Sequence, residues 1–250
     1  MHRTAPRLAR ILACAAVPVM LVVAGCSSDS GGDSDKSSSS GDTGGGGKDS
    51  ASASAAPEVK KSPTVEPAKF AKLPDACKSI PSKTVKDLVP SVKSASGTPS
   101  KSSDTMTRAG CSWNGLDDNG VKGSQYRWLD VSFLRYESDK ALAVSAAKRA
   151  EDSFAKELAK AQATSGAKEV KTAAVSGVGQ RASAVTYELR KTGEDFSYVT
   201  VVARVENTVF TLTYNGTGYA GAKPPAVSGL SKDAAGAAKA VASSVTAANK

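Results

Sequence analysis

Residues 181–214 have the sequence RASAVTYELRKTGEDFSYVTVVARVENTVFTLTY, and this stretch decides the fold. Three runs rich in Val, Thr, Tyr and Phe are separated by short polar breaks at 191–193 and 206–207. β-Branched and aromatic residues favour strands, and such short breaks allow only tight turns. Strands joined by tight turns are antiparallel. The stretch therefore predicts three antiparallel strands, at 181–190, 195–205 and 208–214.

Elements on both sides of this stretch complete the predicted domain. A short helix is predicted at 82–89, and a hairpin is predicted from strands at 111–114 and 125–136. Ser138 is predicted to cap a helix that ends near residue 163 and precedes the three strands. After the strands, an alanine-rich helix is predicted at 231–248. The apolar stripe of the first long helix is Leu142, Ala146, Ala150, Phe154 and Leu158. The order α-β-β-α-β-β-β-α indicates an α+β domain, with helices packed on a mainly antiparallel sheet of about five strands.

The N-terminus has the pattern of an export signal. Arg3, Arg7 and Arg10 precede an apolar run at 11–24, which is shorter than the roughly 20 residues of a membrane-spanning helix. The run ends in Val23-Ala24-Gly25-Cys26, which resembles the lipobox of bacterial lipoprotein precursors. The resemblance implies cleavage before Cys26 and acylation of its thiol by membrane lipid. The alternative is an ordinary signal peptide with an incidental cysteine.

Three segments are predicted from this cleavage. Residues 1–25 are the removed signal peptide, and residues 26–66 are the lipidated cysteine and a Ser/Gly-rich tether too poor in apolar residues to fold. A flexible chain of this length spans roughly 35 Å. Residues 67–250 are expected to form one extracytoplasmic domain on the outer face of the cytoplasmic membrane.

The basic charge belongs to that domain. The chain has a formal net charge of +9, the signal holds three arginines, and the tether holds seven acids against four lysines. Anionic headgroups, wall polymers or an acidic protein would be attracted to such a surface. The alternative is a soluble surface that is simply rich in lysine. Nucleic acid is excluded as a partner because export separates the protein from it.

The four cysteines divide among three locations. Cys14 leaves with the signal and Cys26 takes the lipid, so Cys77 and Cys111 remain in an oxidising compartment. Two such thiols usually pair, and we expect a disulfide between Cys77 and Cys111.

Three short motifs resemble a known family. They are Leu73-Pro74-Asp75-Ala76-Cys77, Gly110-Cys111-Ser112-Trp113, and the turn sequence VSGVGQRA at 175–182. In this order they are similar to a family of actinobacterial secreted lipoproteins whose domain has no assigned function. The resemblance covers residues 73–214 and implies the lipoprotein class and the disulfide. It implies no catalytic residue.

The sequence argues against several classes of enzyme. The one histidine, His2, lies in the signal, which excludes a Ser-His-Asp triad, a Cys-His dyad and a histidine metal site from the mature protein. Ser145 and Lys148, with the Lys-Thr-Gly stretch at 191–193, match penicillin-recognising motifs only in part, because no third element lies between them. Asp117-Asp118-Asn119-Gly120 lacks the spacing of a calcium loop and indicates a turn. We therefore predict no catalytic residue, metal or cofactor.

The strand at 125–136 supplies the candidate binding face. Leu129, Val131 and Phe133 alternate onto a side suited to the core. The other side carries Tyr126, Trp128, Asp130, Ser132 and Tyr136. Tyrosine and tryptophan are enriched where surfaces bind partners or sugars, so this side is the candidate site if it is open. If a helix covers it, the rings form a second core instead.

Three functions are compatible with these features. The leading hypothesis is a non-catalytic, membrane-anchored module that binds an envelope protein or a wall polymer. The second is a wall-polymer hydrolase or transferase that uses paired acids, for which Asp130, Glu188 and Glu206 lie on or beside predicted strands. The third, an importer's binding protein, needs two lobes around a cleft, which so short a domain rarely forms.

Overall fold

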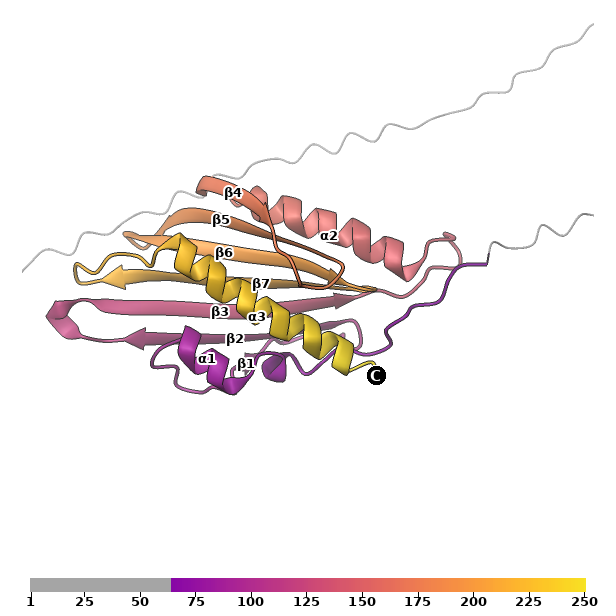
Figure 1. Ribbon diagram of the computed structural model, residues 1–250, viewed down its shortest axis with the longest axis horizontal. Coiled ribbons are helices and arrows are strands. Elements are labelled where there is room, and N and C mark those ends of the chain that lie inside the picture. The colour runs from indigo at the N-terminus through magenta and orange to yellow at the C-terminus, as the bar shows by residue number, and fades with distance from the viewer. Residues whose placement is uncertain (1–63) are drawn as a thin grey trace, which may run out of the picture. The chain divides into compact units, whose positions relative to one another are not determined.

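The computed structural model of the chain describes residues 64–250, so the predicted signal peptide, Cys26 and most of the tether lie outside the described residues. Across this part of the chain, seven strands form one antiparallel sheet in the order β1-β2-β3-β7-β6-β5-β4 (Figure 1). The strands are β1 (Thr98–Pro99), β2 (Arg108–Asp117), β3 (Ser124–Arg135), β4 (Lys168–Ala174), β5 (Arg181–Lys191), β6 (Glu194–Val205) and β7 (Thr208–Tyr219). The helices are α1 (Ser82–Leu88), α2 (Ala146–Gln162) and α3 (Val227–Ala247), with short 3-10 turns η1 (Ala76–Lys78) and η2 (Gly120–Lys122). None of the helices in residues 64–250 is long and apolar enough to cross a membrane.

The sheet consists of two consecutive runs of strands that meet in the middle. The first run is β1 to β3 and the second is β4 to β7, with each strand beside the next one along the chain. The runs join where β3 pairs with β7, from Ser124 opposite Tyr219 to Arg135 opposite Thr208. Both strands of this central pair therefore have a neighbour on each side.

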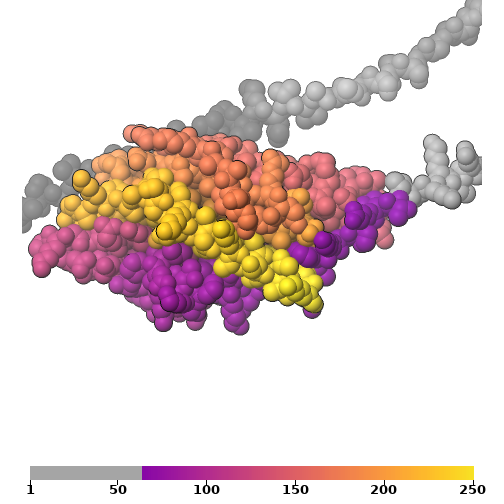
Figure 2. Space-filling view, viewed as in Figure 1, coloured from indigo at the N-terminus to yellow at the C-terminus, as the bar shows by residue number. Residues whose placement is uncertain are grey.

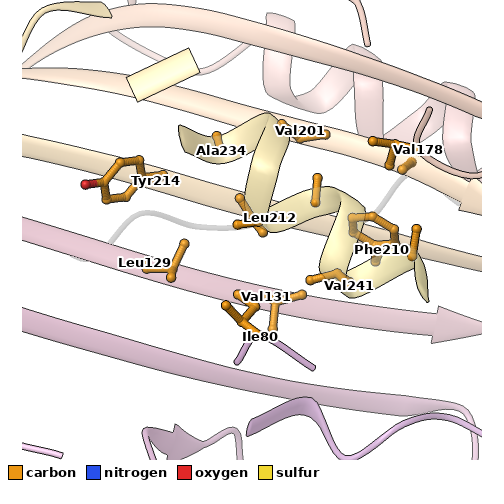
Figure 3. Close-up of a cluster of buried hydrophobic side chains, with 14 of the residues drawn as sticks. Ile80, Leu129, Val131, Val178, Val201, Phe210, Leu212, Tyr214, Ala234 and Val241 are labelled. Carbon is orange, nitrogen blue, oxygen red and sulfur yellow. The ribbon is translucent and has the colours of Figure 1, made fainter. Parts of the chain in front are cut away.

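One side of the sheet, which we call the α3 face, holds the main core. Its buried residues include Leu129 and Val131 of β3, Val201 of β6, and Phe210 and Leu212 of β7 (Figure 3). Phe133 of β3 belongs to the same core. The prediction that alternate residues of β3 point to the core is confirmed, because Leu129, Val131 and Phe133 are at most 1% exposed. Small residues of α3, such as Ala234 and Val241, let the helix lie close to the sheet. Figure 2 shows α3 lying across this side of the molecule.

A disulfide lies on the α3 face, near the edge of the sheet formed by β1 and β2. Cys77, within η1, is joined to Cys111 of β2, and their Cα atoms are 5.1 Å apart. The loop between the two cysteines packs closely against this bond at Gly97, where an added Cβ would lie 2.5 Å from the Cys111 Sγ atom. The disulfide thus fixes the segment with η1 and α1 to the edge of the sheet.

The opposite side, which we call the α2 face, is covered over part of its area by α2. Ala150 and Phe154 of the helix are fully buried against Val202 of β6 and Val209 of β7. The helix N-terminus is capped by Ser145, whose Oγ accepts a hydrogen bond from the Lys148 N–H at 3.2 Å.

Asn207, in the turn between β6 and β7, fixes the point where the chain enters the domain. Its side-chain oxygen accepts a hydrogen bond from the Phe70 N–H at 2.8 Å, and its amide donates to the Phe70 and Tyr136 carbonyls at 2.9 and 2.8 Å. The Asn207 residue is 1% exposed. One side chain therefore ties the entering segment to the ends of two strands.

The predicted α+β class is confirmed, but the predicted count of about five strands is wrong. The two extra strands are β1, which has only two residues, and β4, whose seven residues are all exposed. Neither shows the alternation of buried and exposed positions by which a strand is recognised in a sequence.

The predicted start of the first long helix is also wrong. The helix begins at Ala146, and residues 139–144 form a turn closed by a bridge between Asp139 and Val144. Ser138 accepts a hydrogen bond from the Ala146 N–H at 3.0 Å across this turn. Leu142 is consequently 72% exposed and lies outside the apolar stripe. Ser138 and Ser145 are both followed by apolar residues at helical spacing. Only Ser145 caps the helix.

Candidate functional site

An open hollow of about 560 Å³ lies on the α2 face, beside the area that α2 covers. Strands β3, β6 and β7 and the turn between β5 and β6 supply its lining. The lining residues are Tyr126, Trp128, Asp130, Lys191, Thr192, Phe196, Tyr198, Thr213, Asn215 and Tyr219. Its size falls within the roughly 300–1,000 Å³ of typical ligand sites.

The strand register explains why this surface is concave. Trp128 of β3 lies opposite Asn215 of β7, which lies opposite Tyr198 of β6. One step along the same face, Asp130 lies opposite Thr213. Thr213 and Asn215 of the middle strand are short and polar, whereas Trp128 and Tyr198 on its two sides carry rings. Tyr219, farther along the middle strand, adds a ring to the lining. The result is a trough with a polar floor along β7 and aromatic walls on β3 and β6.

Trp128 and Asp130 form a fixed pair in the β3 wall. The Trp128 indole N–H donates a hydrogen bond to the Asp130 Oδ1 atom at 3.0 Å, and both residues are partly exposed. Burial raises the pKa of the Asp130 carboxyl from 3.8 to about 6, although the hydrogen bond from Trp128 acts in the opposite direction. The carboxyl therefore changes charge in the mildly acidic range, and the indole ring is held in one orientation.

Packed rings and a lysine form the opposite wall. Tyr198 stacks on Tyr187 with ring centroids 4.9 Å apart, and Phe196 contacts Tyr126 edge-on at 6.2 Å. The Lys191 ammonium lies 5.1 Å from the centre of the Tyr198 ring. At this distance a cation is attracted to the electron-rich face of the ring. The wall is therefore rigid in its rings and positively charged at its rim.

The turn that carries Lys191 has the geometry of a tight hairpin. Thr192 and Gly193 have φ values of 50° and 88°, so both central residues are left-handed, which is typical of a type I′ turn. The predicted turn at 191–193 is therefore in the right place.

The structure separates the five residues of the predicted binding face, and Ser132 is exposed outside the hollow. Tyr126, Trp128 and Asp130 line the hollow, whereas Tyr136 lies at the other end of the face, packed beside α2. The Tyr136 hydroxyl hydrogen-bonds to the Ser153 Oγ atom at 2.7 Å, and Arg149 lies 5.6 Å from its ring. The face is thus covered at Tyr136 and open at Trp128.

Most of the remaining lining was missed by the sequence analysis. Tyr198 lies on a predicted strand, but which strands are its neighbours could not be predicted. Asn215 and Tyr219 lie beyond residue 214, where the last strand was predicted to end, because β7 continues to Tyr219. Lys191 and Thr192 were recognised only as turn residues.

The three acids considered for catalysis lie apart. Glu188 is exposed on the opposite face from Asp130, because it pairs with Ser197, the neighbour of Tyr198. Glu206 lies in the turn between β6 and β7 and accepts hydrogen bonds from Lys69 and Gln180. Asp130 is the one acid among the described residues that line the hollow. Within 64–250, no group of three His, Cys, Asp or Glu side chains is placed to hold a metal ion.

Comparison with known proteins identifies no family. No family model matches the sequence, and no curated protein matches it. Among solved structures, the chain is similar to a crystal structure of LpqN, described as involved in cell envelope biogenesis of Mycobacterium tuberculosis. The two share 16% identity with a TM-score of 0.26, over 55% of this chain and 79% of that one. A likeness of this size carries no inference about function.

Proposed function

We propose that the chain is a membrane-anchored lipoprotein whose domain is a non-catalytic binding module of the cell envelope, with the hollow as its ligand site. The observation that carries this proposal is the lining itself. Aromatic rings, polar groups and a lysine converge on one concave surface that no helix of residues 64–250 covers. A few polar groups set among rings are typical of sites that bind a ligand with a defined orientation.

The hollow can be tested as the binding site by crosslinking. A photoreactive residue at Thr192, on the rim of the hollow, should capture envelope material in intact cells. The same group at Leu142, which is 72% exposed outside the hollow, is the matched control. Equal capture from both positions would remove the hollow as the site.

The anchoring part of the proposal depends on Cys26 and can be tested separately. The Cys26→Ala variant should move from the membrane fraction to the medium or accumulate unprocessed. Mature, membrane-bound protein with this substitution would contradict anchoring through Cys26.

A wall-polymer hydrolase or transferase is the second candidate, and one observation favours it. A carboxyl with a pKa of about 6, as Asp130 has, suits a group that transfers a proton near neutral pH. Such a mechanism needs a second acid at about 5 to 10 Å, and the hollow brings no second acid from the described residues next to Asp130. Release of reducing sugar from purified wall by the native chain, lost in Asp130→Asn, would establish the hydrolase instead.

A further inference from the structure

Resting on the proposed binding role of the hollow, we propose that its ligand is a glycan, whose uncharged sugar rings stack on Trp128 and whose hydroxyl groups bond to the polar floor along β7. Four features of the described residues lead to this ligand class. They are the dimensions of the trough, the exposed indole, the free polar groups and the position of the trough within the sheet.

The dimensions of the trough suit a sugar ring. At one end, the rings of Tyr126 and Phe196 meet edge-on across β7, with their centroids 6.2 Å apart, and close the trough. The open part runs along β3 from Trp128 to Asp130, and residues two apart on a strand are separated by about 7 Å. This length accommodates about one six-membered ring.

The indole of Trp128 offers a stacking surface. It is partly exposed, and its N–H is already bonded to Asp130, so its orientation is fixed before a ligand arrives. The C–H face of a pyranose ring is apolar and packs on such a ring, whereas its hydroxyls point outward from the ring edge. A preoriented ring loses little conformational entropy on binding.

The floor offers donors and acceptors that suit hydroxyl groups. The hydrogen bonds among residues 64–250 leave the Asp130 Oδ2 atom and the Asn215 side-chain amide without partners, and Thr213 makes only a long 3.4 Å contact with Thr200. A carboxylate oxygen accepts, an amide both donates and accepts, and a hydroxyl does either. A sugar hydroxyl has the same dual capacity, so adjacent hydroxyls can satisfy all three groups.

The position of the trough argues against an extended peptide. The floor lies over β7, and β3 and β6 flank it, so the backbone groups of these strands are already paired within the sheet. An extended peptide gains most of its affinity by adding to a free strand edge, which this surface lacks. The Lys191 ammonium over Tyr198 also disfavours a cationic ligand, because it already occupies the cation-binding face of that ring.

The test uses the full chain in a detergent without a sugar headgroup, labelled with 5-fluorotryptophan. The chain has two tryptophans, and the other, Trp113, is 2% exposed, so ¹⁹F NMR reports the buried and the partly exposed indole separately. The probes are cellotetraose, chitotetraose and wall glycan strands stripped of their peptides. At least one probe should shift the Trp128 signal and leave the Trp113 signal in place.

Variants define the role of each group. Trp128→Ala should weaken glycan binding by about tenfold or more, as loss of a central aromatic contact commonly does, whereas Trp128→Phe keeps a ring and should lose much less. Thr213→Val removes one hydroxyl without changing the shape and should also weaken binding. Ser132→Ala, on the same strand and face but outside the hollow, should leave binding unchanged.

Two results would contradict the proposal that the ligand is a glycan. They differ in whether they also contradict the proposed binding module. If no glycan moves the Trp128 signal while crosslinking from Thr192 captures a protein, the ligand class is wrong and the binding module stands. If glycans have no effect and Thr192 captures nothing beyond the Leu142 control, both proposals fail. Glycan binding that Trp128→Ala leaves unchanged would place the sugar site outside the hollow.

Discussion

The two faces of the sheet use the same strands for different purposes. On the α3 face, β3, β6 and β7 present mainly aliphatic and aromatic residues, which are buried beneath α3 and the disulfide-linked segment. On the α2 face, the same strands present rings, threonines, an asparagine and an aspartate, and α2 covers only part of them. Burying a carboxyl such as that of Asp130 lowers the free energy of unfolding, so such a group is not expected on a face whose side chains only pack against one another. The α3 face thus supplies the stability that lets the α2 face keep polar groups in a hollow.

The largest expected effect comes from the α3 face. Phe210 is fully buried and its ring centre lies 6.1 Å from that of Phe133, so Phe210→Ala leaves a large cavity. Truncation of a buried phenylalanine typically costs about 3 to 5 kcal/mol of unfolding free energy. Urea denaturation of the variant should show a loss of this size. A loss no larger than that of Trp128→Ala would show that the two faces contribute alike.

Removing the disulfide should have the next largest effect, because it releases the segment that covers one edge of the α3 face. The cysteines are 34 residues apart, and a crosslink closing such a loop contributes about 2 to 4 kcal/mol. The double variant Cys77→Ser, Cys111→Ser should lose this amount in urea denaturation while the Trp128 fluorine signal stays unchanged. A changed Trp128 signal would mean that the two faces are coupled.

Asp130→Asn should stabilise the protein in a pH-dependent way. The pKa of Asp130 is about 6 in the folded protein and 3.8 ordinarily, so the folded state holds the proton more tightly. The free energy of unfolding of the native chain should therefore fall as the pH rises from about 4 to about 6, and then stay lower. Asparagine keeps the acceptor for Trp128 but has no charge to bury, so the variant should gain on the order of 1 to 3 kcal/mol above pH 7. Urea denaturation at pH 4, 6 and 7.5 measures the difference, and a gain independent of pH would contradict this origin.

The smallest stability effect is expected at Trp128. Its ring is partly exposed, so Trp128→Ala should cost only about 1 kcal/mol, through lost packing and the lost hydrogen bond to Asp130. Thermal unfolding should show a small shift, whereas ligand capture through the hollow should be lost. A loss of stability near that of Phe210→Ala would make Trp128 a core residue.

The sequence predicts the strands that carry a strong local pattern. Strand β3 alternates between a buried and a partly exposed side, whereas β6 is buried on both sides and is recognised by its β-branched and aromatic residues. Strands β3, β5, β6 and β7 begin close to their predicted places, but β7 continues to Tyr219, beyond its predicted end at residue 214. Strand β4 is held mainly by backbone pairing with β5, with one hydrogen bond from the Gln162 amide of α2 to the Thr172 hydroxyl, and its exposed side chains leave no pattern to detect. The start of α2 depends on the turn that residues 139–144 form, which is closed by local hydrogen bonds between Asp139 and Val144. The helical spacing of the apolar residues continues through this turn and conceals it.

The candidate site was predictable along one strand and not across strands. Alternation placed Tyr126, Trp128 and Asp130 on one face of β3, where they lie together. Alternation also placed Tyr136 there, but where α2 crosses the face depends on packing that the sequence does not encode locally. Asn215 and Tyr198 join the site only because β7 lies between β3 and β6, a neighbour relation between distant segments.

The attachment of the entering chain through Asn207 has a mechanical consequence. Phe70 is bound at the turn between β6 and β7, whereas the hollow is bordered by the turn between β5 and β6, at the other end of strand β6. A ligand held in the hollow and a tether pulled at Phe70 would load the sheet along its strands. Hydrogen bonds between antiparallel strands then share the load in shear instead of opening one after another. If the proposed anchoring and ligand binding hold, tension between the ligand and the entering chain would pass along the strands of the sheet.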